Sequence, residues 1–207
     1  VYVSDRNSPF MKIGLLHSFL RNKLYKNATG IIAQTHTAKR VLDKNTKNKN
    51  IKVIPNPLRE IEPKKVSQRQ FEKKIILNVG RNVAQKNQLE LIEIFNKCDY
   101  SNWILKIVGS GPLNSALIKK TEELGIEKHV QIIEFTKNID VYYSEADVFA
   151  FTSLYEGFPN ALVEAMAHGI ACISYDCPTG PSDIINNGIN GSLIPLSNMK
   201  SYSENLN

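Results

Sequence analysis

Short apolar runs alternate with segments of helical spacing along most of the chain. From residue 74 onward, runs that suit buried strands are followed by stretches whose apolar residues recur every three or four positions. This alternation predicts an α/β domain with a doubly wound, parallel, Rossmann-like sheet. The expected strands are 75–79, 103–108, 130–133, 148–151, 171–175 and 193–194, and the expected helices are 87–97, 113–124, 138–145, 160–168 and 181–186.

The first 57 residues show a shorter version of the same alternation. Strands are expected at 1–3, 31–33 and 51–54, and helices at 12–26 and 37–42. The prolines of Pro55-Asn56-Pro57 end the last strand, and a polar stretch follows them. We therefore expect residues 1–57 to be the remnant of one Rossmann-like domain, residues 58–200 to form a second domain, and residues 201–207 to be a tail. Because the chain opens on Val and on a strand, we expect it to be part of a longer protein.

Local signals define some ends of these elements. Asn87 is a residue type favoured at helix starts, and Glu90 three residues later predicts a capping box. Gly125 and Gly169 are placed to end two of the helices.

Positive charge is concentrated at one end of the chain. Residues 1–74 contain 17 Lys and Arg against 5 Asp and Glu, whereas residues 75–207 contain 9 against 15. The helix expected at 12–26 alternates apolar and basic residues, so either it packs on a core outside this chain or it touches an anionic membrane surface. The Lys- and Asn-rich run at 44–52 fits a solvated loop, and we expect no nucleic-acid partner.

The other compositional signals favour a cytoplasmic protein with reduced thiols. Cys98, Cys172 and Cys177 are too few and too irregularly spaced for a disulfide scaffold or a zinc site. The chain has no apolar run of the roughly 20 residues that a membrane-spanning helix needs. It also lacks a signal-peptide pattern at its start. We expect a cytoplasmic location that includes the inner face of the cell membrane.

The loop that follows the strand 75–79 has the features of an anion site. Gly80 lets the backbone approach a ligand closely, and the start of the next helix offers free N–H groups. Arg81 and Lys86 add two positive charges, and they are the only Lys or Arg residues between Lys74 and Lys97. This pattern favours phosphate binding over two solvated surface charges.

Two carboxylates mark a second loop, after the strand 148–151. Glu156 lies in the loop, and Glu164 lies about one turn into the helix that starts near Asn160. Gly157 and the N–H groups of that helix start could face a phosphate, while carboxylates are good acceptors for sugar hydroxyls. The combination suits a nucleotide sugar better than a simple phosphate.

These residues carry a family resemblance. Glu156 and Glu164, with Gly-Phe-Pro-Asn-Ala-Leu following Glu156, resemble the Glu-x7-Glu signature of the family-4 (group 1) retaining glycosyltransferases, which have the GT-B fold. Gly80-Arg81 and Lys86-Asn87 are similar to the diphosphate-binding loop of that family. The segments 108–112 and 151–195 also resemble it, so the resemblance covers essentially the whole chain.

The resemblance implies that residues 1–57 end an acceptor-binding domain and that the following domain binds the sugar donor. Arg81 and Lys86 would bind the donor diphosphate. Glu156 would bind the transferred hexose and Glu164 the ribose. By this resemblance, the catalytic residues are Arg81, Lys86 and Glu156. The other residues expected to bind the donor are Gly80, Asn87, Gly109, Phe135, Thr136, Gly157, Phe158, Pro159, Asn160, Ala161, Leu162 and Glu164. Glu134 departs from the family pattern, where Gly is common.

The implied reaction is transfer of a hexosyl group, with retention, from a nucleoside diphosphate sugar to a glycan or a lipid-linked acceptor. UDP is the first choice of nucleotide. Preorganised cations and helix N–H groups can stabilise the charge of the departing diphosphate. The sequence contains no Asp-x-Asp pair, the spacing that suits a magnesium or manganese clamp, so we expect neither a metal nor any cofactor beyond the donor.

Two other interpretations stay open. Gly109-x-Gly111-x-x-Asn114, with Glu134 about 20 residues later, partly matches the fingerprint of a dinucleotide-binding oxidoreductase, although the third glycine is missing. Alternatively, the chain is a donor-binding fragment without catalysis of its own. The histidines fit structural or exposed positions, with His168 near a helix end.

Overall fold

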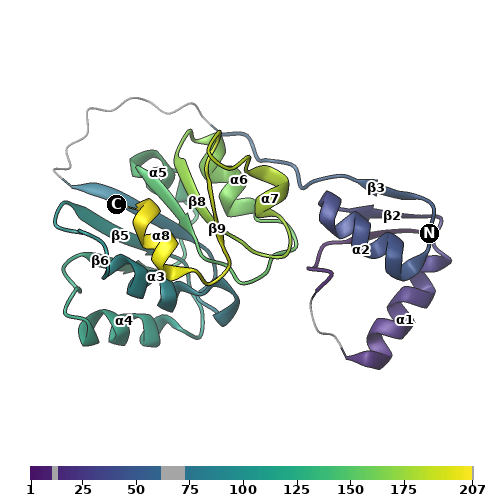
Figure 1. Ribbon diagram of the computed structural model, residues 1–207, viewed down its shortest axis with the longest axis horizontal. Helices are drawn as coiled ribbons and strands as arrows, with labels where there is room; N and C mark the ends of the chain where they lie inside the picture. Colours follow the sequence, from purple (N-terminus) through teal and green to yellow (C-terminus); the bar gives the residue numbers. More distant parts are fainter. Residues whose placement is uncertain (11–13, 62–72, 207) are drawn as a thin grey trace.

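Two α/β bodies make up the protein, and an extended segment joins them (Figure 1). This computed structural model describes residues 1–10, 14–61 and 73–206. The smaller body has a parallel sheet in the order β1-β2-β3, formed by Tyr2–Asp5, Gly30–Ala33 and Ile51–Val53. Its helices are α1 (Leu15–Lys26) and α2 (His36–Thr46), and α2 buries Ala38 and Leu42 against the sheet. Residues 12 and 13 of the first expected helix lie outside the described residues.

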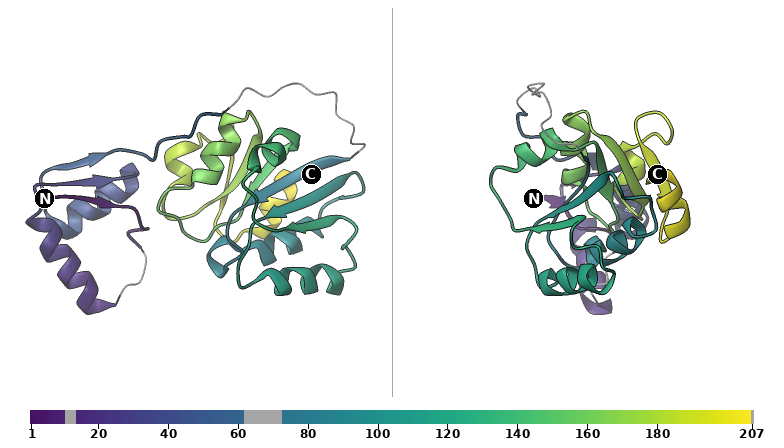
Figure 2. Two further views of the ribbon diagram at one scale, coloured as in Figure 1. Left: turned by 180° about the vertical axis from the view of Figure 1, so that it is seen from behind. Right: turned by 90° about the vertical axis from the view of Figure 1, so that its left-hand side faces the viewer.

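The larger body contains a six-stranded parallel sheet in the order β6-β5-β4-β7-β8-β9. Its strands are β4 (Lys74–Val79), β5 (Trp103–Val108), β6 (Val130–Ile133), β7 (Val148–Phe151), β8 (Ala171–Asp176) and β9 (Ser192–Pro195). The predicted doubly wound α/β fold is therefore confirmed. In the left view of Figure 2, the segment that follows β3 runs along the top to the larger body.

Helices cover both faces of the larger sheet. They are α3 (Gln88–Phe95), α4 (Asn114–Glu123), α5 (Ile139–Glu145), α6 (Asn160–Ala167), α7 (Pro181–Ile184) and α8 (Met199–Leu206). Successive side chains of a strand point to opposite faces. Ile76 accordingly packs with α3, α4 and α8, whereas Leu77 packs with α5 and α6. The two resulting apolar clusters are the core that fixes the strand ends.

Two local expectations differ from the structure. Residues 201–206, expected to be a tail, belong to α8. Tyr202 packs in the core and is fully buried, and its hydroxyl is satisfied there by backbone groups of β7 and β8. The capping box at Asn87 is wrong. Asn87 is left-handed (φ 55°) after a short 3-10 turn, Ala84–Lys86, and its side chain makes no cap bond, while the Glu90 carboxylate accepts from Tyr175.

The three cysteines are free thiols within the larger body. Burial raises the pKa of Cys98 to about 11 and that of Cys172 to about 12. Burial, followed by the charge of Glu156, raises the pKa of Cys177 to about 12. The thiols are therefore protonated near neutral pH and serve as small core side chains.

The backbones at the ends of β4 and β5 approach each other closely. Gly109 follows β5 with φ 156°, and a Cβ atom there would lie 1.8 Å from the carbonyl oxygen of Gly80. Only glycine fits this position without moving the backbone. The contact holds the two loops together, and the buried Asn82 amide strengthens it by donating to the Gly109 carbonyl at 3.0 Å.

We predict that Gly109→Ala lowers the free energy of unfolding by more than about 2 kcal/mol, because the clash is with backbone and cannot be relieved by a side-chain rotation. Gly125→Ala is the matched control. Gly125 also has positive φ, 67°, but a Cβ atom there meets nothing within 4 Å. We expect it to cost about 1 kcal/mol through backbone strain alone. Urea unfolding measures both, and equal losses would contradict the contact.

Candidate functional site

The loops after β4 and β7 lie side by side at the carboxyl edge of the larger sheet, because the two strands pair in parallel. The Leu154 N–H donates to the Gln85 carbonyl at 2.9 Å. The Gln85 side chain donates to the Tyr155 carbonyl at 2.7 Å, and the Thr152 hydroxyl donates to the Lys86 carbonyl at 3.1 Å. These bonds fix the predicted anion loop against the loop that carries Glu156.

Lys86 and Glu156 form an ion pair where the two loops meet. The ammonium nitrogen lies 2.6 Å from Glu156 Oε1, and the two side chains are only 17% and 7% exposed. The ammonium also lies 5.3 Å from the centre of the Phe151 ring, within range of a cation–π contact. The Thr179 hydroxyl donates to the Glu156 carbonyl. The sequence-predicted cation and carboxylate are therefore in direct contact.

A cavity of about 260 Å³ lies between the two bodies, directly beside this ion pair. The larger body contributes Arg81, Glu156 and Phe158, and the smaller body contributes Arg6 and Gln34. Most of its lining groups are polar, so it can bind a hydroxyl-rich ligand such as a hexose.

The two bodies touch around this cavity. A Cβ atom at Gly157 would lie 2.3 Å from the Arg6 carbonyl oxygen, so the absence of a side chain permits the approach. The Asn56 amide donates to the Asn160 side chain at 2.9 Å. Asp183 Oδ1 accepts from the His36 N–H at 2.8 Å, at the start of α2. The cavity walls are thus fixed by contacts that cross between the bodies.

A second cavity, of about 530 Å³, lies over the ends of β4 and β5. Its apolar wall includes Val79, Val108 and Ile139, and Phe135 stands at its rim with 72% of its surface exposed. The sequence-predicted residues Gly80, Arg81, Gly109, Thr136 and Glu164 also line it. An apolar wall that ends in a carboxylate suits a base with its ribose. Arg81 lines both cavities.

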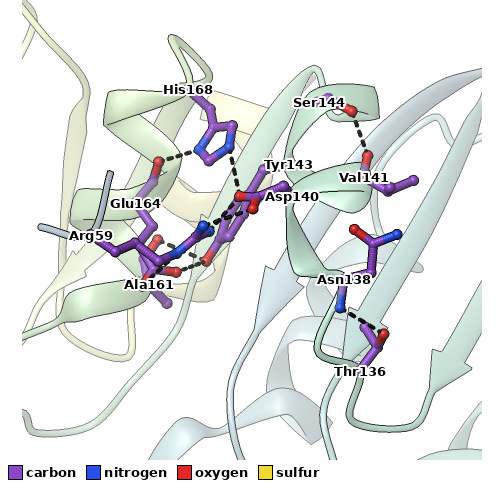
Figure 3. A network of polar contacts seen from close by, with 10 residues as sticks. All are labelled: Arg59, Thr136, Asn138, Asp140, Val141, Tyr143, Ser144, Ala161, Glu164 and His168. Carbon is purple, nitrogen blue, oxygen red and sulfur yellow. Dashed lines mark hydrogen bonds and ion pairs between the residues drawn. The ribbon is translucent and has the colours of Figure 1, made fainter. Parts of the chain in front are cut away.

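Glu164 points to a cluster of polar side chains on α5, α6 and the joining segment (Figure 3). The Tyr143 hydroxyl donates to Glu164 Oε2 at 3.1 Å, and Arg59 Nε lies 3.9 Å from Glu164 Oε1. Burial is the main cause that raises the pKa of Tyr143, and the Glu164 charge adds to it. Tyr143 therefore stays a hydrogen-bond donor throughout the physiological range.

A third cavity, of about 190 Å³, also lies beside Glu164. Five residues that the sequence predicted to bind the donor line none of the three cavities: Lys86, Asn87, Pro159, Ala161 and Leu162. The Leu162 side chain is fully buried in the core. Pro159 packs against Gly180, and the Asn87 carbonyl accepts from Thr152. Any contact of Leu162 with a donor is limited to its backbone. Gly157, Phe158 and Asn160 do line the cavity between the bodies.

In the turn that carries the partial dinucleotide fingerprint, the Asn114 side chain takes up a backbone N–H group that a phosphate would need. Asn114 stands where the third glycine of the fingerprint belongs, and its Oδ1 accepts from the Gly111 N–H at 2.8 Å and from Asn82 at 3.0 Å. These two hydrogen bonds close the turn around the Asn114 side chain. It offers a pyrophosphate less room than the glycine-rich turn of an oxidoreductase requires.

Several site residues were not found from the sequence. Arg6, Gln34 and Asn56 from the smaller body line the cavity between the bodies, and Arg59 contacts Asp140 from the joining segment. Among these residues, only Asn56 lies in a segment that the sequence marks, because it stands between Pro55 and Pro57 at the expected domain boundary. The others are brought to the site by contacts that span many residues of sequence.

The matching family model and two of the matching relatives are described as glycosyltransferases. The family model described as "Glycosyl transferases group 1" matches residues 60–207. The chain is 33% identical over 175 residues to an uncharacterized glycosyltransferase of Methanocaldococcus jannaschii, covering 78% of this chain and 43% of that protein. It is 29% identical over 196 residues to N-acetylgalactosamine-N,N'-diacetylbacillosaminyl-diphospho-undecaprenol 4-alpha-N-acetylgalactosaminyltransferase of Campylobacter jejuni, covering 93% of this chain and 53% of that protein.

Solved structures agree on the fold. The crystal structure of Anabaena HepE in complex with UDP-glucose superimposes with a TM-score of 0.86 at 19% identity, covering 99% of this chain and 61% of that chain. The architecture is that of GT-B glycosyltransferases. The chain spans about half the length of the curated relatives it matches.

We predict that Lys86→Met and Glu156→Gln each lower the free energy of unfolding by about 3 kcal/mol, because each leaves a charge or a polar group poorly compensated in a nearly buried place. The double variant should lose less than the sum of the two. The exposed pair Lys119–Glu123 on α4, given the same substitutions, is the matched control and should show a coupling near zero. Urea unfolding measures the cycle, and strictly additive losses at Lys86 and Glu156 would contradict it.

Proposed function

Because the chain belongs to the group 1 glycosyl transferases, we propose that it binds a nucleoside diphosphate sugar and contributes to hexosyl transfer. The donor we favour is a UDP sugar, the acceptor a glycan or a lipid-linked glycan, and the outcome retention at the anomeric carbon. One observation carries the proposal: Arg81 lines both an apolar cavity that reaches Glu164 and a polar cavity between the bodies, and Glu156, which is paired with Lys86, lines the polar one.

Each part of the donor has a complementary place in this arrangement. The base packs on the apolar wall near Phe135, and the ribose hydroxyls donate to Glu164. The diphosphate lies beside Arg81, which lines both cavities, and the hexose enters the cavity between the bodies. Lys86 binds Glu156 through Oε1, and a carboxylate accepts through both of its oxygens, so Glu156 Oε2 can accept from a sugar hydroxyl.

The bond changes of the proposed reaction balance between the donor and the acceptor. The bond between the anomeric carbon and the diphosphate oxygen breaks, and its electron pair stays on that oxygen. Arg81 and Lys86 stabilise the charge that develops there. The acceptor hydroxyl oxygen bonds to the anomeric carbon on the same face, and its proton passes to the departing phosphate oxygen. Attack from that face gives retention.

The names of the relatives support the classes of substrate. The Campylobacter jejuni relative is named for transfer to a diphospho-undecaprenol-linked sugar, and a lipopolysaccharide 1,6-galactosyltransferase of Salmonella typhimurium is 34% identical over 132 residues. The HepE structure holds UDP-glucose. We infer that a complete enzyme containing this chain acts in polysaccharide or glycoconjugate synthesis. This part alone binds the donor without transferring the sugar, because an acceptor site needs more of the smaller body.

We predict that UDP binds this chain equally well with a divalent metal and with EDTA, because Arg81 and Lys86 supply the charge that a metal would. At about one hundred times Kd the ligand should add about 2.7 kcal/mol of stability, which raises the unfolding midpoint by roughly 5 to 10 °C. Lys86→Ala should remove most of this shift, whereas the exposed Lys97→Ala should keep it. In a full-length enzyme that contains this chain, Glu156→Ala should cripple transfer.

Thermal unfolding with millimolar UDP, GDP, ADP and NADH tests the binding. An unchanged midpoint with all three diphosphates would sink the proposal, and a shift with NADH alone would favour the oxidoreductase interpretation. Loss of the UDP shift in EDTA would contradict metal independence only.

We also propose that α1 contacts an anionic membrane surface, where a lipid-linked acceptor would lie. No helix in the described ranges is long and apolar enough to span a bilayer. On α1, however, Leu16 and Phe19 are 68% and 64% exposed, and Lys23 and Lys26 follow on the same helical face. Apolar and basic groups on one exposed face suit attachment to a membrane surface.

We predict that Lys23→Gln with Lys26→Gln weakens binding to vesicles rich in phosphatidylglycerol by about 30-fold, since each lysine contributes about 1 kcal/mol near an anionic surface. The control is Lys39→Gln with Lys44→Gln, which removes the same charge from exposed positions on α2. Sedimentation of the full chain with vesicles measures both. Binding that is absent in the parent chain, or that does not respond to salt, would refute the membrane contact.

A further inference from the structure

Arg59, in the segment that joins the two bodies, docks on the larger body beside Glu164 (Figure 3). Its Nη1 donates to Asp140 Oδ2 at 2.7 Å, and its Nη2 donates to the other oxygen of the same carboxylate. This two-pronged geometry fixes the plane of the guanidinium group. The remaining nitrogen, Nε, faces Glu164 Oε1 at 3.9 Å.

Asp140 also contacts His168. One ring nitrogen of His168, Nε2, lies 3.1 Å from Asp140 Oδ1, and the other lies 2.8 Å from the Glu164 carbonyl oxygen. The His168 side chain is only 3% exposed and its ring stacks on Tyr143. The hydrogen bond from Arg59 is the main cause that lowers the pKa of Asp140. Asp140 is therefore ionised near neutral pH and holds Arg59 in place.

Glu164 separates two cavities. On one side it ends the apolar cavity over β4 and β5, and on the other it lines a smaller cavity of about 190 Å³ together with Arg59. Its side chain is 24% exposed. A carboxylate beside an apolar wall is stabilised by hydrogen-bond donors and positive charge close to its oxygens. Tyr143 supplies a donor to Oε2, and Arg59 supplies the charge beside Oε1.

At 3.9 Å, Arg59 is too far from Glu164 Oε1 to form a hydrogen bond with it. Its charge acts on the carboxylate while Oε1 keeps its capacity to accept. We propose that Arg59 is a positioning residue for nucleotide recognition: it aims the Glu164 carboxylate so that it accepts from the ribose hydroxyls of a nucleoside diphosphate. This inference rests on the proposed function and adds a residue from the joining segment to the donor site.

The test compares UDP with 2′,3′-dideoxy-UDP, because only UDP carries the hydroxyls that Glu164 would accept. Hydrogen bonds to a charged group contribute about 1.5 to 3 kcal/mol, so the parent chain should bind UDP roughly 10- to 100-fold more tightly. Arg59→Gln should reduce this ratio at least about fivefold, and Arg59→Lys should restore part of it. Glu164→Gln should reduce the ratio as well, and adding Arg59→Gln to it should change little.

Calorimetric titration of the full chain measures both affinities, and urea unfolding shows that each variant is folded. Lys120→Gln is the matched control, since it breaks a comparable ion pair with Glu93 outside the cavities and should leave the ratio unchanged. A structural role for Arg59 would lower both affinities equally, and an unchanged ratio in Arg59→Gln alongside a lost ratio in Glu164→Gln would overturn the inference. A parent chain that binds no nucleoside diphosphate would instead overturn the proposed function.

Discussion

The ion pair between Lys86 and Glu156 is the interaction on which the geometry of the site depends. It joins loops from neighbouring strands at a place where both side chains are nearly buried. Charges in such a place are stable only when their partners are fixed, and the hydrogen bonds between the two loops provide that fixing. The ammonium group is therefore fixed on Glu156, which lines the cavity between the bodies, before any substrate arrives. In the proposed mode it has little reorganisation to undergo when a diphosphate binds.

A second constraint is the contact between the two bodies. The bare backbone of Gly157 lies against the Arg6 carbonyl, and Asn56 bonds to Asn160. The Asp183 carboxylate binds the first N–H groups of α2, where the helix carries partial positive charge. Because residues of both bodies line the cavity between them, a change at any of these contacts alters its shape. In the proposed binding mode, this links donor recognition to the relative position of the bodies.

Much of the larger body could be predicted from the sequence because its signals are local. The strands 103–108, 130–133 and 148–151 match in full, since each is an apolar run with clear ends. Spacing alone placed Glu156 in a loop and Glu164 on a helix. Contacts over long separations were not predictable: Arg59 and Asp140 are 81 residues apart, and α8 contributes few apolar residues to its core face. Asn87 was misread because a 3-10 turn changes how the helix starts.

The two glutamates share a signature but differ in their surroundings, which suits them to different parts of one ligand. Glu156 is in direct contact with a lysine. Glu164 instead accepts a hydrogen bond from a tyrosine, and an arginine lies near it but beyond hydrogen-bonding distance. In each case the compensating groups leave part of the carboxylate able to accept from a hydroxyl. A nucleotide sugar carries hydroxyls at both ends and negative charge between them. In the proposed mode the diphosphate must therefore span the space between the cavities, and Arg81, which lines both, stands where that charge would lie.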